Sequence, residues 1–322
     1  MGITAADAGA SARMADSVQP AGTTEHFAAF SFVDRIIDLV PGKSARGVFA
    51  IPAALDTFAS CLVAEATGQL AAWVAMAHIA FRGRPVAALA NETRFLADPA
   101  PGQTLELAVD IEHCDDEAVA YRGQAHAGGV KLLELVDCLG PMLPCAEFDA
   151  PEALAARFDL LCAAGAPAGR FHGIAPIRLV SGETIAGERA AATLFVPESA
   201  PFFADHFPRR PVFPATLLLD QQIRLALDLA ATTAHWPAGT RVRPARMTHV
   251  KVRAFMPPGS VLELSAEMAP MSAEPSPTAA SAASTSAASA PTTAAANIRL
   301  AAHMDAKQVA SARLEVAAKV PT

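Results

Sequence analysis

The 322-residue chain has few aromatic side chains and no concentration of positive charge. Phenylalanine, tyrosine and tryptophan make up 6% of the residues although 52% are hydrophobic, so alanine and aliphatic side chains must form most of any core. The formal net charge is -7, and no basic stripe offsets it. A nucleic-acid-binding protein needs such a stripe to neutralise phosphates, so the composition argues against nucleic acid as a partner.

Paired cysteines and long apolar runs are also missing. None of the five cysteines lies in a CxxC or at a spacing typical of metal ligands, which predicts free thiols, no bound metal and a reducing, cytoplasmic location. No stretch reaches the roughly 18 uncharged apolar residues that cross a membrane. Residues 1–26 lack the continuous apolar core of a secretory signal. We therefore expect a cytoplasmic protein without a membrane span.

Two segments have the composition of disordered chain. Residues 1–26 are rich in Ala, Gly, Ser and Thr, and we expect a disordered tail there. Residues from about 270 to 296 contain one charge, no aromatic side chain and almost no large aliphatic one. Such a segment cannot offset its ordering entropy by burial, so a disordered insertion is predicted between two strand-like patterns.

An internal repeat organises the rest of the chain. "PGQTLELAVDIE" (101–112) matches "PGSVLELSAEMA" (258–269). Upstream of each copy lies a long apolar helix candidate, at about 55–77 and 215–236, with alternating strand-like segments before and after it. Because one apolar helix can cover the apolar face of an antiparallel sheet, we expect the α+β class, with two repeats of a long helix wrapped by a sheet. The predicted domains are 27–147 and 171–322, joined by a linker helix at 148–170.

The stretch "HFPRRPVFPATLLLD", His206 to Asp220, is the strongest candidate for chemistry. Its prolines predict an extended loop, and the apolar spacing after Pro214 predicts a helix that carries Asp220. Taken alone, the two residues are equally well explained as a loop histidine and a solvated helix acid.

The spacing H-F-P-x-R-P-x-x-P-x-x-L-x-x-[DE] resembles the FabA/FabZ-like beta-hydroxyacyl-acyl-carrier-protein dehydratases, a family with the hotdog fold. The chain matches that pattern at His206, Phe207, Pro208, Arg210, Pro211, Pro214, Leu217 and Asp220, and departs from the family's glycines at Arg209 and Ala215. In the first half, "FSFVDRIIDLVPGK" and "AEATGQ" resemble the same family. The resemblance to both halves implies a fused tandem, or double hotdog.

In that family each site takes its histidine from one hotdog unit and its acid from the other. Aligning Glu65 with Asp220 places Ile51 opposite His206. The resemblance therefore implies one working site, with His206 as base and Glu65 as acid, and makes Asp220 a vestigial or supporting residue. Gln69 would orient Glu65.

Further contacts follow from the same resemblance. Phe207, Pro214 and the backbone N–H of Ala215 would bind the substrate, the last as an oxyanion donor. Arg209 and Arg210 would contact a phosphopantetheine or its carrier, unless they are only a solvated rim.

The implied activity is a cofactor-free dehydratase that converts a 3-hydroxyacyl thioester to the trans-2-enoyl product in fatty-acid or polyketide-type lipid synthesis. The substrate would be carried by an acyl-carrier protein or coenzyme A, and whether two such double-hotdog chains dimerise further stays open. Two alternatives stay open, namely a hotdog thioesterase and a catalytically inactive scaffold that binds the acyl carrier.

Overall fold

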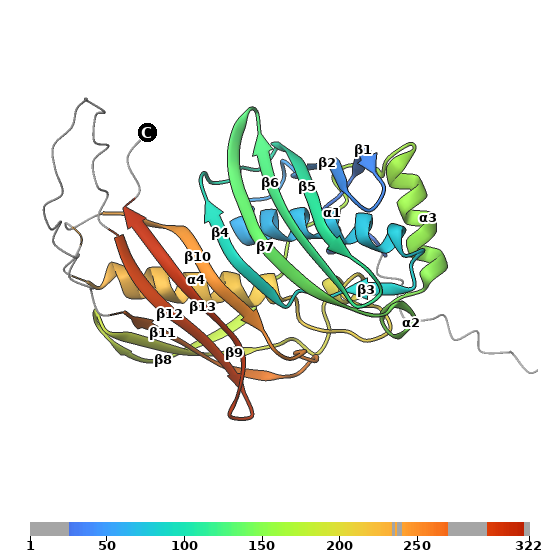
Figure 1. Ribbon diagram of the computed structural model, residues 1–322. Helices are drawn as coiled ribbons and strands as arrows, with labels where there is room; N and C mark the ends of the chain where they lie inside the picture. The colour runs from blue at the N-terminus through green and yellow to red at the C-terminus, as the bar shows by residue number, and fades with distance from the viewer. Residues whose placement is uncertain (1–25, 234–235, 237–239, 270–294, 319–322) are drawn as a thin grey trace, which may run out of the picture.

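The computed structural model describes residues 26–233, 236, 240–269 and 295–318. In these ranges, strands form one antiparallel sheet in the order β1-β2-β5-β6-β7-β4-β10-β13-β12-β11-β9-β8, with β3 added beside β7 (Figure 1). The first half supplies β1 (Arg35–Val40), β2 (Ser44–Ala50), β3 (Gly83–Pro85), β4 (Leu89–Phe95), β5 (Thr104–Cys114), β6 (Ala118–Ala127) and β7 (Val130–Pro144). The second half supplies β8 (Arg178–Ile185), β9 (Arg189–Phe195), β10 (Val242–Val252), β11 (Val261–Met268), β12 (Ala295–Met304) and β13 (Lys307–Ala318).

The predicted fold class, α+β with a separate sheet in each of two repeats, is wrong. The strands of both halves join in a single 13-stranded antiparallel sheet, and helices make up a minor part of the described chain. The junction is the antiparallel pair β4–β10, in register from Leu89 opposite Lys251 to Arg94 opposite Arg246. An unpaired sheet edge leaves N–H and C=O groups open to other chains, and this pairing removes two such edges. The repeat pattern contains no signal for which edges meet.

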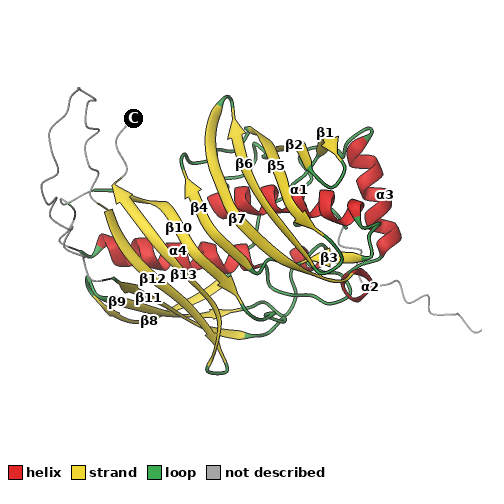
Figure 2. Ribbon diagram, in the orientation of Figure 1, coloured by secondary structure: helices red, strands yellow, loops and turns green. Residues whose placement is uncertain are grey.

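Two long helices, α1 (Ser60–His78) and α4 (Ala215–Ala231), lie against the inner surface of this sheet (Figure 2). Leu70 and Leu218 are fully buried, and each such side chain contributes about 1.5–3 kcal/mol on burial. The helix α1 is apolar on most of its surface because strands of its own half and the neighbouring α4 surround it.

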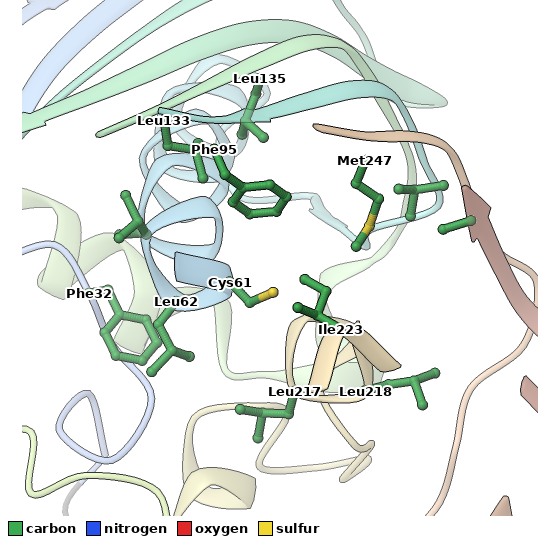
Figure 3. Packing of buried hydrophobic residues seen from close by; sticks show 14 of the residues in the cluster. Phe32, Cys61, Leu62, Phe95, Leu133, Leu135, Leu217, Leu218, Ile223 and Met247 are labelled. Atoms are coloured by element: carbon green, nitrogen blue, oxygen red, sulfur yellow. The ribbon is translucent and has the colours of Figure 1, made fainter. Parts of the chain in front are cut away.

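The two helices share one apolar region with the joining strands. In Figure 3, Cys61 of α1 points toward Ile223 of α4, and Phe95 of β4 and Met247 of β10 extend into the same region. All four side chains belong to the main hydrophobic cluster. The β4–β10 junction is therefore held by side-chain packing as well as by the strand ladder.

The remaining helical segments are short. The helices α2 (Cys145–Phe148) and α3 (Pro151–Cys162) follow β7, and the 3-10 turn η1 (Pro201–Ala204) precedes the His206 loop. Residues 1–25 and 270–294 hold most of the expected tail and insertion and lie outside the described residues, so the domain boundaries stay predictions. In the part that the structure describes, no helix combines the length and apolarity that crossing a membrane requires.

Candidate active site

A cavity of about 230 Å³ lies between the two halves. Its walls come from α1, the strands β3, β4, β6, β7 and β10, the loop before α4 and the first turn of α4, and most of them are apolar. The polar side chains that line it are Ser31, Glu65, Gln69, Arg84, Thr93, Tyr121, Asp205, His206 and Thr216. A mainly apolar cavity with a few convergent polar groups is typical of a binding or catalytic site.

The carboxylate of Glu65 is held from both sides. Gln69, one turn further along α1, donates from Nε2 to Glu65 Oε1 at 2.9 Å. Thr216 of α4 donates from Oγ1 to Glu65 Oε2 at 2.8 Å. Gln69 is itself fixed, because its Oε1 accepts the Phe32 N–H at 2.8 Å and its Nε2 also contacts the Phe30 carbonyl at 2.9 Å. Glu65 therefore has one orientation relative to the cavity.

His206 lines the same cavity from the other half of the chain. Its Nδ1 lies 3.0 Å from the carbonyl oxygen of Val212, and a carbonyl can only accept, so Nδ1 carries a proton. Burial lowers the pKa of His206, with the Glu65 charge and the Val212 hydrogen bond acting in the opposite direction. The imidazole is then neutral near pH 7, with Nε2 free to accept a proton.

The loop around His206 brings Phe207 and Ala215 to the cavity but not Pro214. The Phe207 ring is stacked on the His206 ring with centroids 4.4 Å apart. Pro214 caps α4, and Ala215 is its first residue. Ala215 does not have a positive φ, so a side chain causes no backbone strain where the family has glycine. Its N–H is among the first of the helix, which have no intrahelical acceptor.

Asp220 and Ile51 do not line the cavity. Asp220 accepts a hydrogen bond from Arg224 Nε at 2.9 Å, one helical turn away, and burial raises the pKa of Asp220. Ile51 is packed in the main hydrophobic cluster. Arg224 follows Asp220 by four positions, just as Gln69 follows Glu65. The second half therefore has an Asp220–Arg224 ion pair at the place where the first half has the hydrogen bond between Glu65 and Gln69.

Arg209 and Arg210 lie on the exposed side of the His206 loop. Arg209 Nη1 donates to the Ala146 carbonyl at 2.9 Å, and Arg210 Nη1 lies 3.5 Å from Glu147 Oε2. The Arg210 guanidinium also stands 5.0 Å from the ring centroid of Phe255, which lines the cavity. Both arginines thus have partners in the protein and remain open to solvent.

Sequence reasoning missed three polar residues of this site. Thr216 lies inside the motif, but at a position where the motif accepts any residue. Arg84 of β3 places its guanidinium 4.7 Å from the centre of the Phe207 ring, with Nη1 3.8 Å from Asp149 Oδ2. Burial lowers the pKa of Arg84, and the Asp149 charge opposes that shift. No spacing in the sequence links Arg84 to the His206 loop.

Asp205 is the third missed residue, although it directly precedes His206. One of its oxygens accepts the Phe30 N–H at 2.7 Å and the Ser31 hydroxyl at 3.2 Å, and the other accepts the Phe27 N–H. More than half of the protein's length thus separates partners that meet beside the cavity. This carboxylate therefore binds the first described segment of the chain to the His206 loop.

Among residues 26–233, 236, 240–269 and 295–318, no group of three or more His, Cys, Asp or Glu side chains lies close enough to hold a metal ion.

Comparison with known proteins gives a family match over part of the chain and a shared fold. The family described as ApeI-like, ApeI dehydratase, matches residues 183–289, a segment that includes His206 but not Glu65. The tesB protein MAP1729c of Mycobacterium avium subs paratuberculosis is 14% identical, with a TM-score of 0.50 over 88% of this chain and 96% of that one. A protein from Lactobacillus plantarum assigned as an oleoyl thioesterase is 10% identical, with a TM-score of 0.51 over 88% of this chain and 100% of that one. At these identities the likeness shows the fold, which is hotdog-like.

Proposed function

We propose that this protein removes water from a 3-hydroxyacyl thioester to give the trans-2-enoyl thioester. The observation that carries the proposal is that His206 and Glu65, from opposite halves of the chain, line one largely apolar cavity and are each oriented by hydrogen bonds. The histidine motif and the dehydratase family match over residues 183–289 support the same activity.

The two side chains have complementary roles in this reaction. His206 Nε2 takes the proton from C2, and the electrons of that C–H bond form the C2–C3 double bond. The C3–O bond breaks, and Glu65 donates a proton to the departing hydroxyl, which leaves as water. Return of the proton from His206 to Glu65 restores the starting state. Thr216 and Gln69 keep the carboxyl directed at the leaving group.

The thioester carbonyl gains negative charge while C2 loses its proton. The N-terminus of α4 supplies N–H groups without intrahelical acceptors, and Ala215, its first residue, lines the cavity. We assign the Ala215 N–H as a donor to this oxygen, where a preorganised donor stabilises the transition state.

The acyl carrier would be an acyl-carrier protein or coenzyme A, and the pathway one of fatty-acid or polyketide-type synthesis. Arg209 and Arg210 are our candidates for contact with its phosphate, and Arg210 lies beside Phe255 of the cavity wall.

A hotdog thioesterase is the second candidate function. It is favoured by the shared fold with the protein assigned as an oleoyl thioesterase. In such an enzyme Glu65 would activate a water molecule for attack on the thioester, and the products would be a free thiol and a carboxylic acid.

One assay separates the candidates. The purified chain is incubated with a 3-hydroxyacyl N-acetylcysteamine thioester while enoyl absorbance and free thiol are followed together. We expect enoyl product without thiol, and a loss of about a hundredfold or more in His206→Ala and in Glu65→Gln.

Asp220→Asn is the matched control, since Asp220 lies outside the cavity and we expect nearly full activity. Thiol release that depends on Glu65 would show that the protein is a thioesterase and not a dehydratase. Saturable binding of an acyl carrier without turnover would favour the scaffold, and loss of activity only in Asp220→Asn would overturn the site assignment.

A further inference from the structure

A second depression, of about 550 Å³, lies on the face of the sheet that points away from α4. It spans β10, β13, β12 and β11, which are adjacent strands at the lower left of Figure 1. Side chains alternate along each strand: Ala266, Ala302 and Leu314 are buried on the helix side, whereas their neighbours line the depression. We call this depression the outer trough.

The register of the strands explains its shape. Ser265 lies opposite Ala301, Ala301 opposite Ser311, and Ser311 opposite Lys251, so a row of small side chains forms the floor. Because the side chains of this row are short, the space above them is open, and this space is the depression.

Basic residues border this floor on both sides. Along one side Arg299 lies opposite Arg313, and along the other His303 lies opposite Gln308. Arg253 extends the second side, since its N–H bonds to the Val309 carbonyl.

The outer trough is strongly basic in a chain whose formal net charge is -7. Four fixed cations and two histidines line it, against the single carboxylate of Glu267; they are Lys251, Arg253, Arg299, Arg313, His249 and His303. Arg299 and Arg313 are directly opposite on neighbouring strands, an arrangement that is destabilising for like charges. An anion bound between Arg299 and Arg313 would attract both side chains and so offset their mutual repulsion.

Internal partners use only part of this charge. Arg299 Nη2 lies 3.2 Å from Glu267 Oε2, and Arg253 Nη1 donates to the Ser311 hydroxyl at 3.0 Å. Over the described ranges, Lys251 and Arg313 make no ion pair through their side chains. Two cations at the floor and rim are therefore available to a ligand.

The outer trough is separate from the catalytic cavity. Val250 and Val252 of β10 line that cavity, while Lys251 between them lines the outer trough on the opposite face. A ligand held here cannot be the acyl chain that reaches His206. The sheet itself stands between the two sites.

We propose that the outer trough binds a small molecule that carries at least two phosphate groups. Guanidinium groups pair with phosphate oxygens through two parallel hydrogen bonds, and the floor hydroxyls of Ser265 and Ser311 add donors. The volume is that of a small-ligand site and not of a flat protein interface.

The charge of the outer trough sets the number of phosphates. Four fixed cations against the single carboxylate of Glu267 leave three positive charges. A phosphate monoester carries about 1.5 to 2 negative charges near pH 7, so two phosphate groups match the trough better than one.

Isothermal titration of the full-length chain with pyrophosphate, ADP and adenosine 3′,5′-bisphosphate, at about 0.15 M salt, tests this proposal. We expect one site per chain, with orthophosphate bound at least about tenfold more weakly. Tighter binding of the 3′,5′-bisphosphate would identify the nucleotide end of coenzyme A as the natural ligand. Tighter binding of ADP would identify a free nucleotide as the natural ligand.

The double variant Lys251→Gln/Arg313→Gln should weaken binding by about tenfold or more. Lys43→Gln/Arg46→Gln, which removes two exposed cations from the first half, is the matched control and should bind like the unmodified chain. Circular dichroism establishes that both variants are folded. Absence of binding by all three probes up to about 1 mM, or equal weakening by both double variants, would overturn the proposal.

Discussion

The hydroxyl of Thr216 donates to the carboxylate of Glu65 at 2.8 Å across 151 positions of sequence. Thr216 lies in the first turn of α4 and Glu65 in α1, so this bond joins the long helices of the two halves beside His206. With Gln69 on the other oxygen, it leaves Glu65 little freedom to rotate.

Removing this hydroxyl should slow the proposed dehydration without unfolding the protein. In Thr216→Val, which keeps the side-chain shape, we expect kcat to fall about tenfold or more. Glu65 becomes a carboxylate as it gives up its proton, and a hydrogen bond to such a charged group contributes about 1.5–3 kcal/mol. KM should change little, since the carboxyl acts on the reacting atoms. Steady-state kinetics with a 3-hydroxyacyl thioester measure both constants. Thr216→Ser should recover most of the activity, and equal loss in the Ser and Val variants would contradict the hydrogen-bond explanation.

His26 should make stability depend on pH in the alkaline range. Burial alone would lower the pKa of His26, but hydrogen bonds to Asp149 and Asp205 raise it to about 9. Because this folded-state pKa lies above the ordinary value of 6.5, the stabilisation is complete below about pH 6.5 and is lost as pH rises through about 9. Urea unfolding at intervals from pH 6.5 to 10 should show this decline in the unmodified chain and a smaller one in His26→Gln.

His113→Gln is the control for that series. His113 also pairs with a carboxylate, Asp115 at 2.9 Å, but both side chains are about half exposed, so the pair contributes little to stability. Identical pH profiles for His26→Gln and the unmodified chain would refute the role of the buried contacts.

Gln222 of α4 should limit stability. It is fully buried, and neither polar atom of its amide has a hydrogen-bond partner within the described residues. Since an unpaired buried polar group costs about 1–3 kcal/mol, Gln222→Met should raise the free energy of unfolding by a similar amount. Equilibrium unfolding in urea measures this. Gln221→Met, whose amide donates to Asp220 at 3.2 Å, should give no such gain, and a less stable Gln222→Met would show that the amide has a bound partner.

Much of the local structure was predictable because it depends on periodicity. The second long helix begins at Ala215, where the prolines end, and the first occupies Ser60–His78, close to the expected 55–77. The matched segments that open with Pro101 and Pro258 lead into the strands β5 and β11. In each case neighbouring residues decide the outcome, through proline's fixed φ or through alternation of apolar side chains.

The candidate site was only partly predictable. The motif identified the His206 loop, and the internal alignment singled out Glu65 as its partner. Thr216, Arg84 and Asp205 were missed, because their significance depends on contacts with residues from the other half of the chain. The fold class was wrong for the same reason, since the pairing of β4 with β10 unites the strands in one sheet.

By itself, the sequence determined where helices and strands form and which loop carries the histidine, since these depend on dihedral preference and on burial of one face of each element. Only the tertiary structure decided that the two halves share one sheet, that Thr216 and Gln69 together hold Glu65, and that basic side chains line an outer trough. Those features depend on strand register and on contacts between distant segments, which follow from the packing of the whole chain and not from any local pattern.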